Sequence, residues 1–360
     1  MSAARGTLAH RVWRGESLGL RLLRAALLIP AAVYRAGVDL RNAAFDVGLL
    51  RSRALPVPSV GVGNIAVGGT GKTPVAAYLA GELARRGRRP GILLRGYRGG
   101  DEAAEHAARL PGVVVVADPD RHRGALRAIR EGADALVLDD CLQRRDVRTD
   151  LLLAVLAVES AGERRWPLPA GPWREGLGAL GRCDAVVVTY KVAPPDAAAA
   201  VARRLAARTR LGLGVAAGLK LARFLPLAGG EPLAAGALAG RDVVAVCGIG
   251  APERFRAQLE ALGARVRLLD FGDHHAYTAS DVADAIEAAG PDGLTVTTAK
   301  DAVKFRSLYR AQAPACVVAE LEVRVTYGDS DLARLLDRMA RVQPNPVTAA
   351  DPPSARSRIP

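Results

Sequence analysis

The stretch Pro58-Ser-Val-Gly-Val-Gly-Asn-Ile-Ala-Val-Gly-Gly-Thr-Gly-Lys-Thr73 decides the fold. It begins within a short β-branched run, residues 57–62, and continues into a turn that is rich in glycine. A helical pattern then runs from Pro74 to Arg86, and proline suits an early helical position. A strand, a glycine-rich turn and a helix in this order are typical of a loop that binds the phosphates of a nucleotide. The stretch therefore predicts an α/β fold with a P-loop NTPase-type α/β/α domain.

The glycine-rich turn supplies three kinds of group for phosphate binding. Its glycines leave room for backbone N–H groups to converge on phosphate oxygens. Lys72 adds a cation for the β- and γ-phosphates, and the Thr73 hydroxyl can ligate Mg²⁺. The residues expected to bind the nucleotide are Ala66, Val67, Gly68, Gly69, Thr70, Gly71, Lys72 and Thr73.

The same stretch has an alternative interpretation. The P-loop pattern places a glycine where this chain has Ala66, and Gly61-x-Gly63-x-x-Ala66 imitates a dinucleotide-binding fingerprint. However, the next expected strand, Gly91 to Leu94, ends at Arg95 and not at an acid that would hold a ribose. A P-loop is therefore favoured, and an NAD(P) site remains the alternative.

A P-loop needs an acidic partner for its metal ion at the end of a neighbouring strand. Ala135-Leu-Val-Leu-Asp-Asp140 provides four apolar residues followed by two acids. Such a run is a weak signal by itself, because many strands end in an acid. Downstream of a P-loop it becomes a strong one, and Asp139 and Asp140 are the candidates for binding Mg²⁺.

A second acidic pair, in Gly100-Asp101-Glu102, opens another helical pattern from Ala103 to Leu110. Carboxylates at a helix start are stabilised by the helix dipole, so helix capping explains them. The functional alternative is a base or a metal contact beside the γ-phosphate. The spacing alone does not decide between the two.

Composition narrows the class of protein. The chain has 360 residues and 37.7 kDa, which is long for one domain and comfortable for two. Its 50 basic and 37 acidic residues give a net charge of +13, which suits nucleic acid, anionic lipid or a phosphate-bearing substrate. Aromatic residues make up only 4% of the chain, which argues against nucleic acid. The four cysteines form no CxxC pair, which argues against a disulfide scaffold or a zinc ribbon.

The N-terminal segment concentrates the positive charge, because residues 1–55 contain nine arginines and three acidic residues. Leucines and alanines between the arginines fit an amphipathic helix, or a helix pair, at a bilayer interface. A helix packed on the protein's own core with solvated arginines fits equally well. The longest early apolar run, Ala25 to Tyr34, contains Pro30 and is shorter than the roughly 20 residues that span a bilayer.

These motifs occur in an order that resembles the tetraacyldisaccharide 4′-kinase (lipid A 4′-kinase) family over roughly residues 11–340. The matching segments are Trp13-Arg-Gly-Glu-Ser17, Pro56 to Asn64, Val67 to Pro74, Leu94-Arg-Gly-Tyr97, Gly100-Asp-Glu102, Leu138 to Gln143, Leu168 to Glu175, Gly248 to Phe255, Asp273-His-His275 and Lys300 to Lys304. So many separate motifs in one order are hard to produce by chance.

The resemblance implies a kinase that uses ATP and Mg²⁺ to phosphorylate the 4′-hydroxyl of a tetraacylated glucosamine disaccharide 1-phosphate. It implies two α/β/α domains that meet at a cleft, and an N-terminal helix on the membrane. The expected partners are the lipid disaccharide and an anionic membrane surface, without nucleic acid and without an obligate protein partner. The expected location is the cytoplasmic face of the bacterial inner membrane, as a peripheral protein.

The resemblance also implies roles for single residues. Lys72 and Thr73 match the phosphate-loop lysine and the metal-binding hydroxyl. Asp139 and Asp140 match paired acids of which one holds Mg²⁺, and Glu102 is a candidate metal neighbour.

The remaining residues are expected to act on the acceptor substrate. Asp101 matches an acid that works with a histidine, here His274, to take the proton of the sugar hydroxyl. An imidazole oriented by a carboxylate is suited to proton transfer near neutral pH. Arg174 matches a clamp for the substrate phosphate. Without the resemblance, all five histidines read as loop residues, including His10, His106 and His122.

Departures from the family pattern leave alternatives open. Cys141 and Arg144 stand where the family usually has Gly and His, and Ala299 replaces an acid. Gly99 runs straight into Gly100-Asp101, so Asp101 is either in place after a deletion or misaligned. The alternatives are a degenerate paralogue that binds ATP and membrane without transfer, or a P-loop transferase for another substrate.

The rest of the chain alternates apolar strand-like runs with helical ones, which predicts parallel sheets covered by helices. Thr278-x-x-Asp281 predicts a capping box that opens a helix. Gly212, Gly214 and Gly218 indicate a domain junction. The expected division is an amphipathic segment at residues 1–55, a P-loop kinase domain at 56–212, a smaller α/β domain at 213–342 and a disordered tail at 343–360.

Overall fold

The computed structural model describes residues 11–13, 15, 17–96, 101–110, 112–161, 165–273, 275–309 and 315–342, and only the backbone of residues 101, 102 and 108. His274 and the expected tail, residues 343–360, lie outside the described residues.

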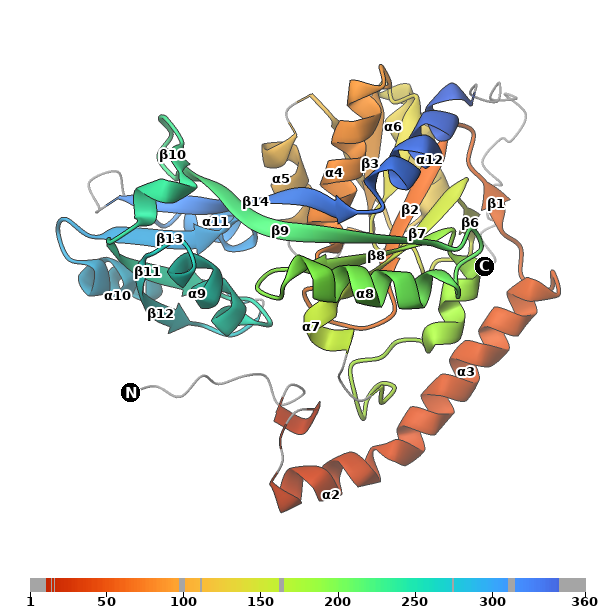
Figure 1. The fold of residues 1–360 in the computed structure, drawn as a ribbon, viewed down its shortest axis with the longest axis horizontal. Helices are drawn as coiled ribbons and strands as arrows, with labels where there is room; N and C mark the ends of the chain where they lie inside the picture. The colour runs from red at the N-terminus through yellow and green to blue at the C-terminus, as the bar shows by residue number, and fades with distance from the viewer. Residues whose placement is uncertain are drawn as a thin grey trace, which may run out of the picture.

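One large mixed sheet runs through the described part of the chain (Figure 1). Its strands, in spatial order, are β12 (Arg265–Asp270), β11 (Asp242–Cys247), β13 (Leu294–Thr298), β14 (Cys316–Tyr327), β9 (Leu213–Pro226), β8 (Ala185–Tyr190), β7 (Leu151–Ala157), β2 (Ser59–Asn64), β5 (Ala135–Leu138), β3 (Pro90–Leu94) and β4 (Val114–Ala117). β10 (Leu233–Ala234) pairs with β9, and β1 (Arg53–Ala54) pairs with β6 (Val147–Arg148) in a separate small sheet.

The central pair of this sheet, β9 and β14, is antiparallel and unusually long, with 14 and 12 residues. The other neighbours along the sheet order are parallel. Both long strands extend from the first half of the molecule (β2–β8) into the second half (β10–β13), and they join the two (Figure 1).

The helices after residue 46 cover both faces of the sheet. In chain order the described helices are α2 (Leu18–Ala26), α3 (Leu28–Asp46), α4 (Lys72–Arg85), α5 (Asp101–Arg109), α6 (Arg121–Arg130), α7 (Val158–Ala161), α8 (Pro195–Ala206), α9 (Pro252–Glu260), α10 (Ala279–Ala289), α11 (Ala299–Phe305) and α12 (Asp329–Arg341), with 3-10 turns η1 (Leu177–Arg182) and η2 (Ala235–Leu238). The expected capping box is present at Thr278 and Asp281.

Separate apolar cores cover the two faces. In the first half, α4 and α12 bury Leu79 and Leu336 against one face, while α8 buries Ala202 against the other. In the second half, α9 contributes Phe255 to one core and α10 contributes Val282 to another. This three-layer arrangement is the α/β/α fold that the sequence predicts.

The N-terminal helices α2 and α3 run along one side of the molecule, away from the sheet (Figure 1). Polar contacts hold α3: Asn42 Nδ2 donates to Glu175 at 2.9 Å, and Arg145 Nη2 donates to Asp46 at 2.6 Å. The large apolar side chains that these helices leave exposed are Leu18, Leu22, Leu23, Ile29, Val33 and Leu40. Among the described residues, no helix combines the length and the apolar character needed to cross a bilayer.

Candidate active site

The glycine-rich turn connects the end of β2 to the start of α4. Gly68 and Gly71 have φ angles of +123° and +85°, which favour glycine because a Cβ atom would strain the backbone. At Gly71 a Cβ atom would also lie 2.4 Å from Cδ1 of Leu219. Gly71 is the N-cap of α4, so the turn aims the helix N-terminus and its unpaired N–H groups at the space above β2.

Side chains from other strands hold this loop in place. Thr189, in β8, donates its hydroxyl to the carbonyl of Thr70 at 2.7 Å. Asn64 Nδ2, in β2, donates to Thr70 Oγ1 at 3.2 Å, and the backbone N–H of Val67 donates to the carbonyl of Pro172 at 2.7 Å. The loop is therefore organised for a ligand without needing the ligand to order it.

The paired acids lie beside the loop because of the strand order. β5 pairs in parallel with β2, with Leu138 opposite Gly61, so the residues that follow β5 emerge next to the loop that follows β2. Asp140 Oδ1 lies 3.7 Å from Lys72 Nζ. The acids therefore lie after a neighbouring strand and beside the loop, as the sequence predicts, and their role as metal ligands stays a prediction.

Arg174 contacts Asp140 directly. Its Nη1 donates to Oδ1 and Oδ2 of Asp140 at 2.9 and 3.2 Å, and to Oε1 of Gln143 at 3.2 Å. Lys72, Asp140 and Arg174 thus form a cluster in which one carboxylate lies between two cations.

Asp139 is buried behind this cluster. Its Oδ1 accepts the backbone N–H of Asp140 at 2.8 Å, and its Oδ2 lies 3.4 Å from Nε2 of His106. Burial opposes ionisation of Asp139, but the His106 contact and the charge of Lys72 outweigh burial and hold the pKa of this carboxyl below its usual value. Asp139 is therefore a carboxylate over the whole neutral range.

The expectation that His106 and His122 are loop residues is wrong. His106 lies in α5 and His122 in α6, and His106 is only 1% exposed because its face of α5 turns toward β5 and Asp139. His10 lies outside the described residues.

The sequence also missed Glu175. Its side chain is buried and accepts hydrogen bonds from Asn42, Gln143 and Arg182. These bonds connect α3 and the acidic turn, which is the turn after β5 that contains the paired acids, to the segment that carries Arg174. The adjacency of Glu175 to Arg174 in the sequence was the available signal.

The remaining candidates are placed less completely. Thr73 is the second residue of α4, beside Lys72. Asp101 and Glu102 are the first two residues of α5, as the sequence predicts, and their side chains are not described.

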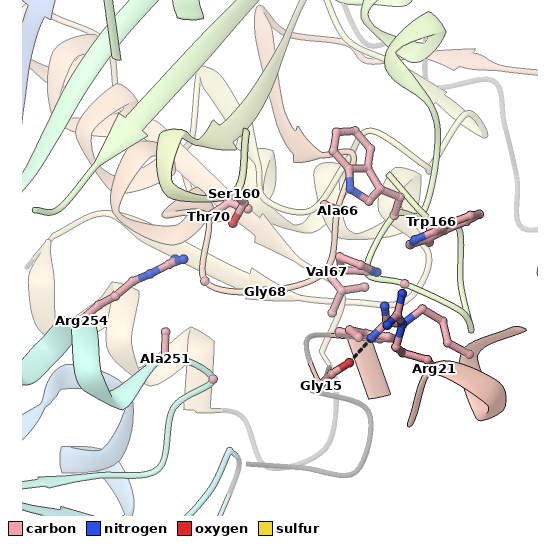
Figure 2. A pocket seen from close by; sticks show the side chains of 17 residues that line it. Gly15, Arg21, Ala66, Val67, Gly68, Thr70, Ser160, Trp166, Ala251 and Arg254 are labelled. Carbon is pink, nitrogen blue, oxygen red and sulfur yellow. Dashed lines mark hydrogen bonds between the residues drawn. The ribbon is translucent and has the colours of Figure 1, made fainter. Parts of the chain in front are cut away.

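A cavity of about 700 Å³ opens beside the outer part of the loop (Figure 2). Its walls include Ala66 to Thr70, the tryptophans Trp13 and Trp166, Arg21 of α2 and Arg254 of α9. Trp13 Nε1 donates to the carbonyl of Pro169 at 3.0 Å, which fixes the N-terminal wall. Arg21 and Arg254 come from opposite sides of the cavity, and neither guanidinium has a hydrogen-bond or ion-pair partner among the described residues (Figure 2).

Comparison with known proteins decides the family. The chain matches the family model described as tetraacyldisaccharide-1-P 4′-kinase over residues 23–341. The chain belongs to this 4′-kinase family. Relatives named tetraacyldisaccharide 4′-kinase include those of Anaeromyxobacter sp. (strain Fw109-5), 35% identical over 92% of this chain and 96% of the relative, and of Methylobacterium sp. (strain 4-46), 40% identical over 79% and 85%.

A solved structure of the 4′-kinase family agrees. The crystal structure of the "apo" form of LpxK from Aquifex aeolicus in complex with ATP has 28% sequence identity, covers 88% of this chain and 99% of its own, and gives a TM-score of 0.69. The P-loop kinase fold expected from the sequence is therefore confirmed, and the NAD(P) alternative has no support.

The donor set of the 4′-kinase site fits Mg²⁺. Mg²⁺ in phosphoryl-transfer enzymes is usually bound by one or two carboxylates together with phosphate and water oxygens. Asp139, Asp140 and the Thr73 hydroxyl are oxygen donors of this kind, near the phosphate loop. Among the described residues, those of this site included, no three His, Cys, Asp or Glu side chains gather as an all-protein metal site would require, so phosphate and water oxygens would complete the Mg²⁺ coordination.

Proposed function

We propose that this member of the 4′-kinase family carries out transfer from ATP at the P-loop to a lipid headgroup in the adjoining cavity. The acceptor is the 4′-hydroxyl of a tetraacylated glucosamine disaccharide 1-phosphate. The observation that carries the proposal is the cluster of Lys72, Asp140 and Arg174 at the phosphate loop, whose outer part lines a cavity that also has Arg21 and Arg254 in its walls. Positive charge is needed there because the transferred phosphoryl group carries negative charge on its equatorial oxygens.

In this account ATP binds through residues 66–73. The backbone N–H groups of the turn and of the first turn of α4 bind the phosphate oxygens, and Lys72 Nζ places its charge at the β- and γ-phosphates. Because Thr189 and Asn64 already hold Thr70, the loop stays in its binding conformation.

Mg²⁺ would be held by the Thr73 hydroxyl and the paired acids, with Glu102 as a further neighbour. Mg²⁺ supplies charge neutralisation for the phosphates. Of the two acids, Asp140 is the better direct ligand, because its side chain is 29% exposed and that of Asp139 is 4% exposed. Asp139, already bonded by His106 and the Asp140 N–H, orients the turn.

Asp101 and His274 act together on the acceptor hydroxyl in this proposal. Asp101 opens α5, and α11 packs against α5. Lys300, in α11, donates to Asp273 at 2.7 Å, so the residue before His274 is tied to the helix that contacts α5. These contacts support a position for the pair between the two halves.

Asp101→Ala and His274→Ala should each lower kcat by about 100-fold, because positioned general acid–base groups contribute roughly that much or more. The double variant should be little worse than the poorer single variant, since groups that act as a unit are not additive. Steady-state kinetics of the three variants measures this. Fully independent effects would mean that the residues do not form a pair.

Arg21 and Arg254 bind the phosphate already present on the acceptor. Both guanidinium groups line the cavity and have no hydrogen-bond or ion-pair partner within the described ranges of the chain, and a guanidinium recognises phosphate with two parallel hydrogen bonds. Arg174, in contrast, is engaged with Asp140 and Gln143. We assign the phosphate at position 1 to Arg21 and Arg254, and assign to Arg174 a role in holding Asp140 and in clamping substrate phosphate near the transfer site.

Arg21→Met and Arg254→Met should each raise KM for the lipid by about 10-fold, the size expected for one charge-assisted hydrogen bond, and leave KM for ATP near the wild-type value. The matched control is Arg256→Met, in the same helix α9, where the side chain pairs with Glu253 and Glu260 instead. An acceptor without the 1-phosphate should remove the difference between variant and wild type. A rise in KM for ATP instead would assign these arginines to the nucleotide.

The exposed side of α2 and α3 suits a membrane surface. Arg21 points into the cavity, and Leu18 and Leu22 of the same helix are exposed at 73% and 62%. A headgroup in the cavity would therefore keep its acyl chains beside an apolar helix face. We infer that the protein binds an anionic membrane surface, at the cytoplasmic face of the bacterial inner membrane.

The identity of the acceptor hydroxyl can be tested directly. With labelled ATP and Mg²⁺, the tetraacyldisaccharide 1-phosphate should gain a second phosphate, and its 4′-deoxy analogue should gain none. Equal labelling of the two lipids would place transfer at another hydroxyl and would contradict the proposal.

A further inference from the structure

Arg121 is a buried cation that the functions above do not use. It is the first residue of α6 and is 1% exposed, the largest fully buried side chain among the described residues. Its Nη2 donates to the backbone carbonyl of Asp139 at 2.6 Å. Its Nε and Nη1 are buried and have no hydrogen-bond partner in the described part of the chain.

Such a residue is unfavourable for folding by itself. A buried guanidinium loses its hydration, and two of its three nitrogens recover no hydrogen bond. The neighbouring Cys141 does not compensate this charge, because burial raises the pKa of its thiol to about 12 and the thiol stays neutral. The compensating charges are the carboxylates Asp139 and Asp140.

The carbonyl that Arg121 contacts belongs to a strained peptide. Asp140 has a φ of +53°, and it is the one described residue other than glycine with a positive φ. The peptide group between Asp139 and Asp140 is held at both of its polar atoms. Its carbonyl accepts from Arg121 at 2.6 Å, and its N–H donates to Asp139 Oδ1 at 2.8 Å. Since the orientation of this peptide plane sets φ of Asp140, the two bonds together fix where the Asp140 carboxylate points.

Arg144 connects the segment that precedes Arg121 to the segment that follows the paired acids. Its Nη2 donates to the carbonyl of Pro119 at 3.0 Å and to Asp146 at 2.8 Å. The residues just before α6 are thus tied to the segment just after the paired acids.

We propose that Arg121 is a positioning residue, which holds the Asp139–Asp140 peptide in its left-handed conformation so that the Asp140 carboxylate faces Lys72. The proposal rests on the proposed function only for the activity readout. The chain keeps a buried and poorly bonded charge at this point because the bond to the Asp139 carbonyl fixes the acidic turn.

Arg121→Met tests the proposal, because methionine fills a similar volume without a charge or a donor. The midpoint of thermal unfolding, measured without nucleotide or metal, should stay the same or rise, since an apolar side chain replaces a buried charge. kcat should fall by about 10- to 100-fold, the effect of a small misplacement at a reacting centre, with KM for ATP changed little. Amide hydrogen exchange at Asp140 should become faster, because the peptide is released.

Two further variants make the result specific. Arg121→Lys keeps a charge and a donor and should recover most of the lost kcat. Arg123→Met, in the same helix, removes an exposed arginine that pairs with Asp118, and should leave kcat and Asp140 exchange unchanged. In an Asp140→Asn background, Arg121→Met should cost little additional activity, because both changes act on the same carboxylate.

A large fall in the unfolding midpoint together with unchanged Asp140 exchange would mean that Arg121 is a structural residue only. Wild-type kcat in Arg121→Met would equally overturn the proposal. If the wild-type protein phosphorylated no lipid, the proposed function would fail, while the exchange and unfolding measurements would still decide the role of Arg121.

Discussion

Lys72→Ala is expected to lower kcat for phosphoryl transfer by about 10³-fold or more. Cations that stabilise the charge of a transferring phosphoryl group contribute effects of this size. Lys72 opens α4 at the helix N-terminus, and among the side chains of the phosphate loop it is the cationic one. Arg174, the other cation of the cluster, is bonded to Asp140 and Gln143, so it does not take over the role of Lys72.

The same variant should still bind ATP, more weakly, through the backbone N–H groups of the loop. Its thermal unfolding should resemble that of wild type, since Lys72 is partly exposed and its contact with Asp140 is 3.7 Å. Arg85→Ala is the matched control: it removes an exposed cation from the same helix, where it pairs with Glu82, and should keep wild-type kcat. Substantial residual transfer by Lys72→Ala would contradict the assignment of the phosphate loop.

Asp140→Asn is expected to lower kcat by about 10²- to 10³-fold, because the loss of one charged group that contacts a reacting centre has an effect of this size. The change leaves Lys72 and Arg174 without the carboxylate that lies between them. It also removes a hard oxygen ligand, so the Mg²⁺ concentration that gives half-maximal rate should rise. Folding should be little affected, because asparagine tolerates the positive φ of this position better than most residues.

Rates at a series of Mg²⁺ concentrations measure this prediction. Asp337→Asn removes a half-exposed carboxylate that pairs with Arg86 far along the chain, and should leave the Mg²⁺ dependence unchanged. If Asp139→Asn shifted the Mg²⁺ dependence and Asp140→Asn did not, the two acids would have the reverse roles.

Most of the fold could be predicted from the sequence where a short apolar run ended at a clear signal. β2, β5 and α4 follow from the phosphate loop and the paired acids, and Thr278 with Asp281 marks the start of α10. These features are local, so the sequence contains the whole signal.

The long pair β9 and β14 was missed for a physical reason. Gly214 and Gly218 indicate a junction by their spacing but not a strand, and both lie inside β9, one of the two strands that join the halves. A Cβ atom at Gly214 would lie 2.3 Å from the carbonyl of Ala202, so this glycine permits close packing of α8 on the strand. The outer part of β14 alternates exposed and half-buried residues, and that pattern depends on its antiparallel partner.

Site residues that follow a strand could be predicted from the sequence. Site residues on the inner face of a helix were missed. His106 and Arg121 are polar residues in helices, which are usually solvated, and only the packing of α5 and α6 on the sheet brings them to Asp139. Two residues that depart from the family pattern make contacts of their own in this structure. Cys141 is buried against β2, and Arg144 pairs with Asp146. Ala299 joins the apolar core of the second half.

Lipid phosphorylation at the P-loop is tested most directly by a transfer assay with purified protein, labelled ATP, Mg²⁺ and tetraacyldisaccharide 1-phosphate in mixed micelles, run beside Lys72→Ala. We expect a labelled lipid with two phosphates from the wild-type protein and at least 10³-fold less from the variant. An unlabelled lipid from a wild-type protein that binds ATP would mean that the cluster of Lys72, Asp140 and Arg174 serves another acceptor or none, and lipid phosphorylation would have to be abandoned.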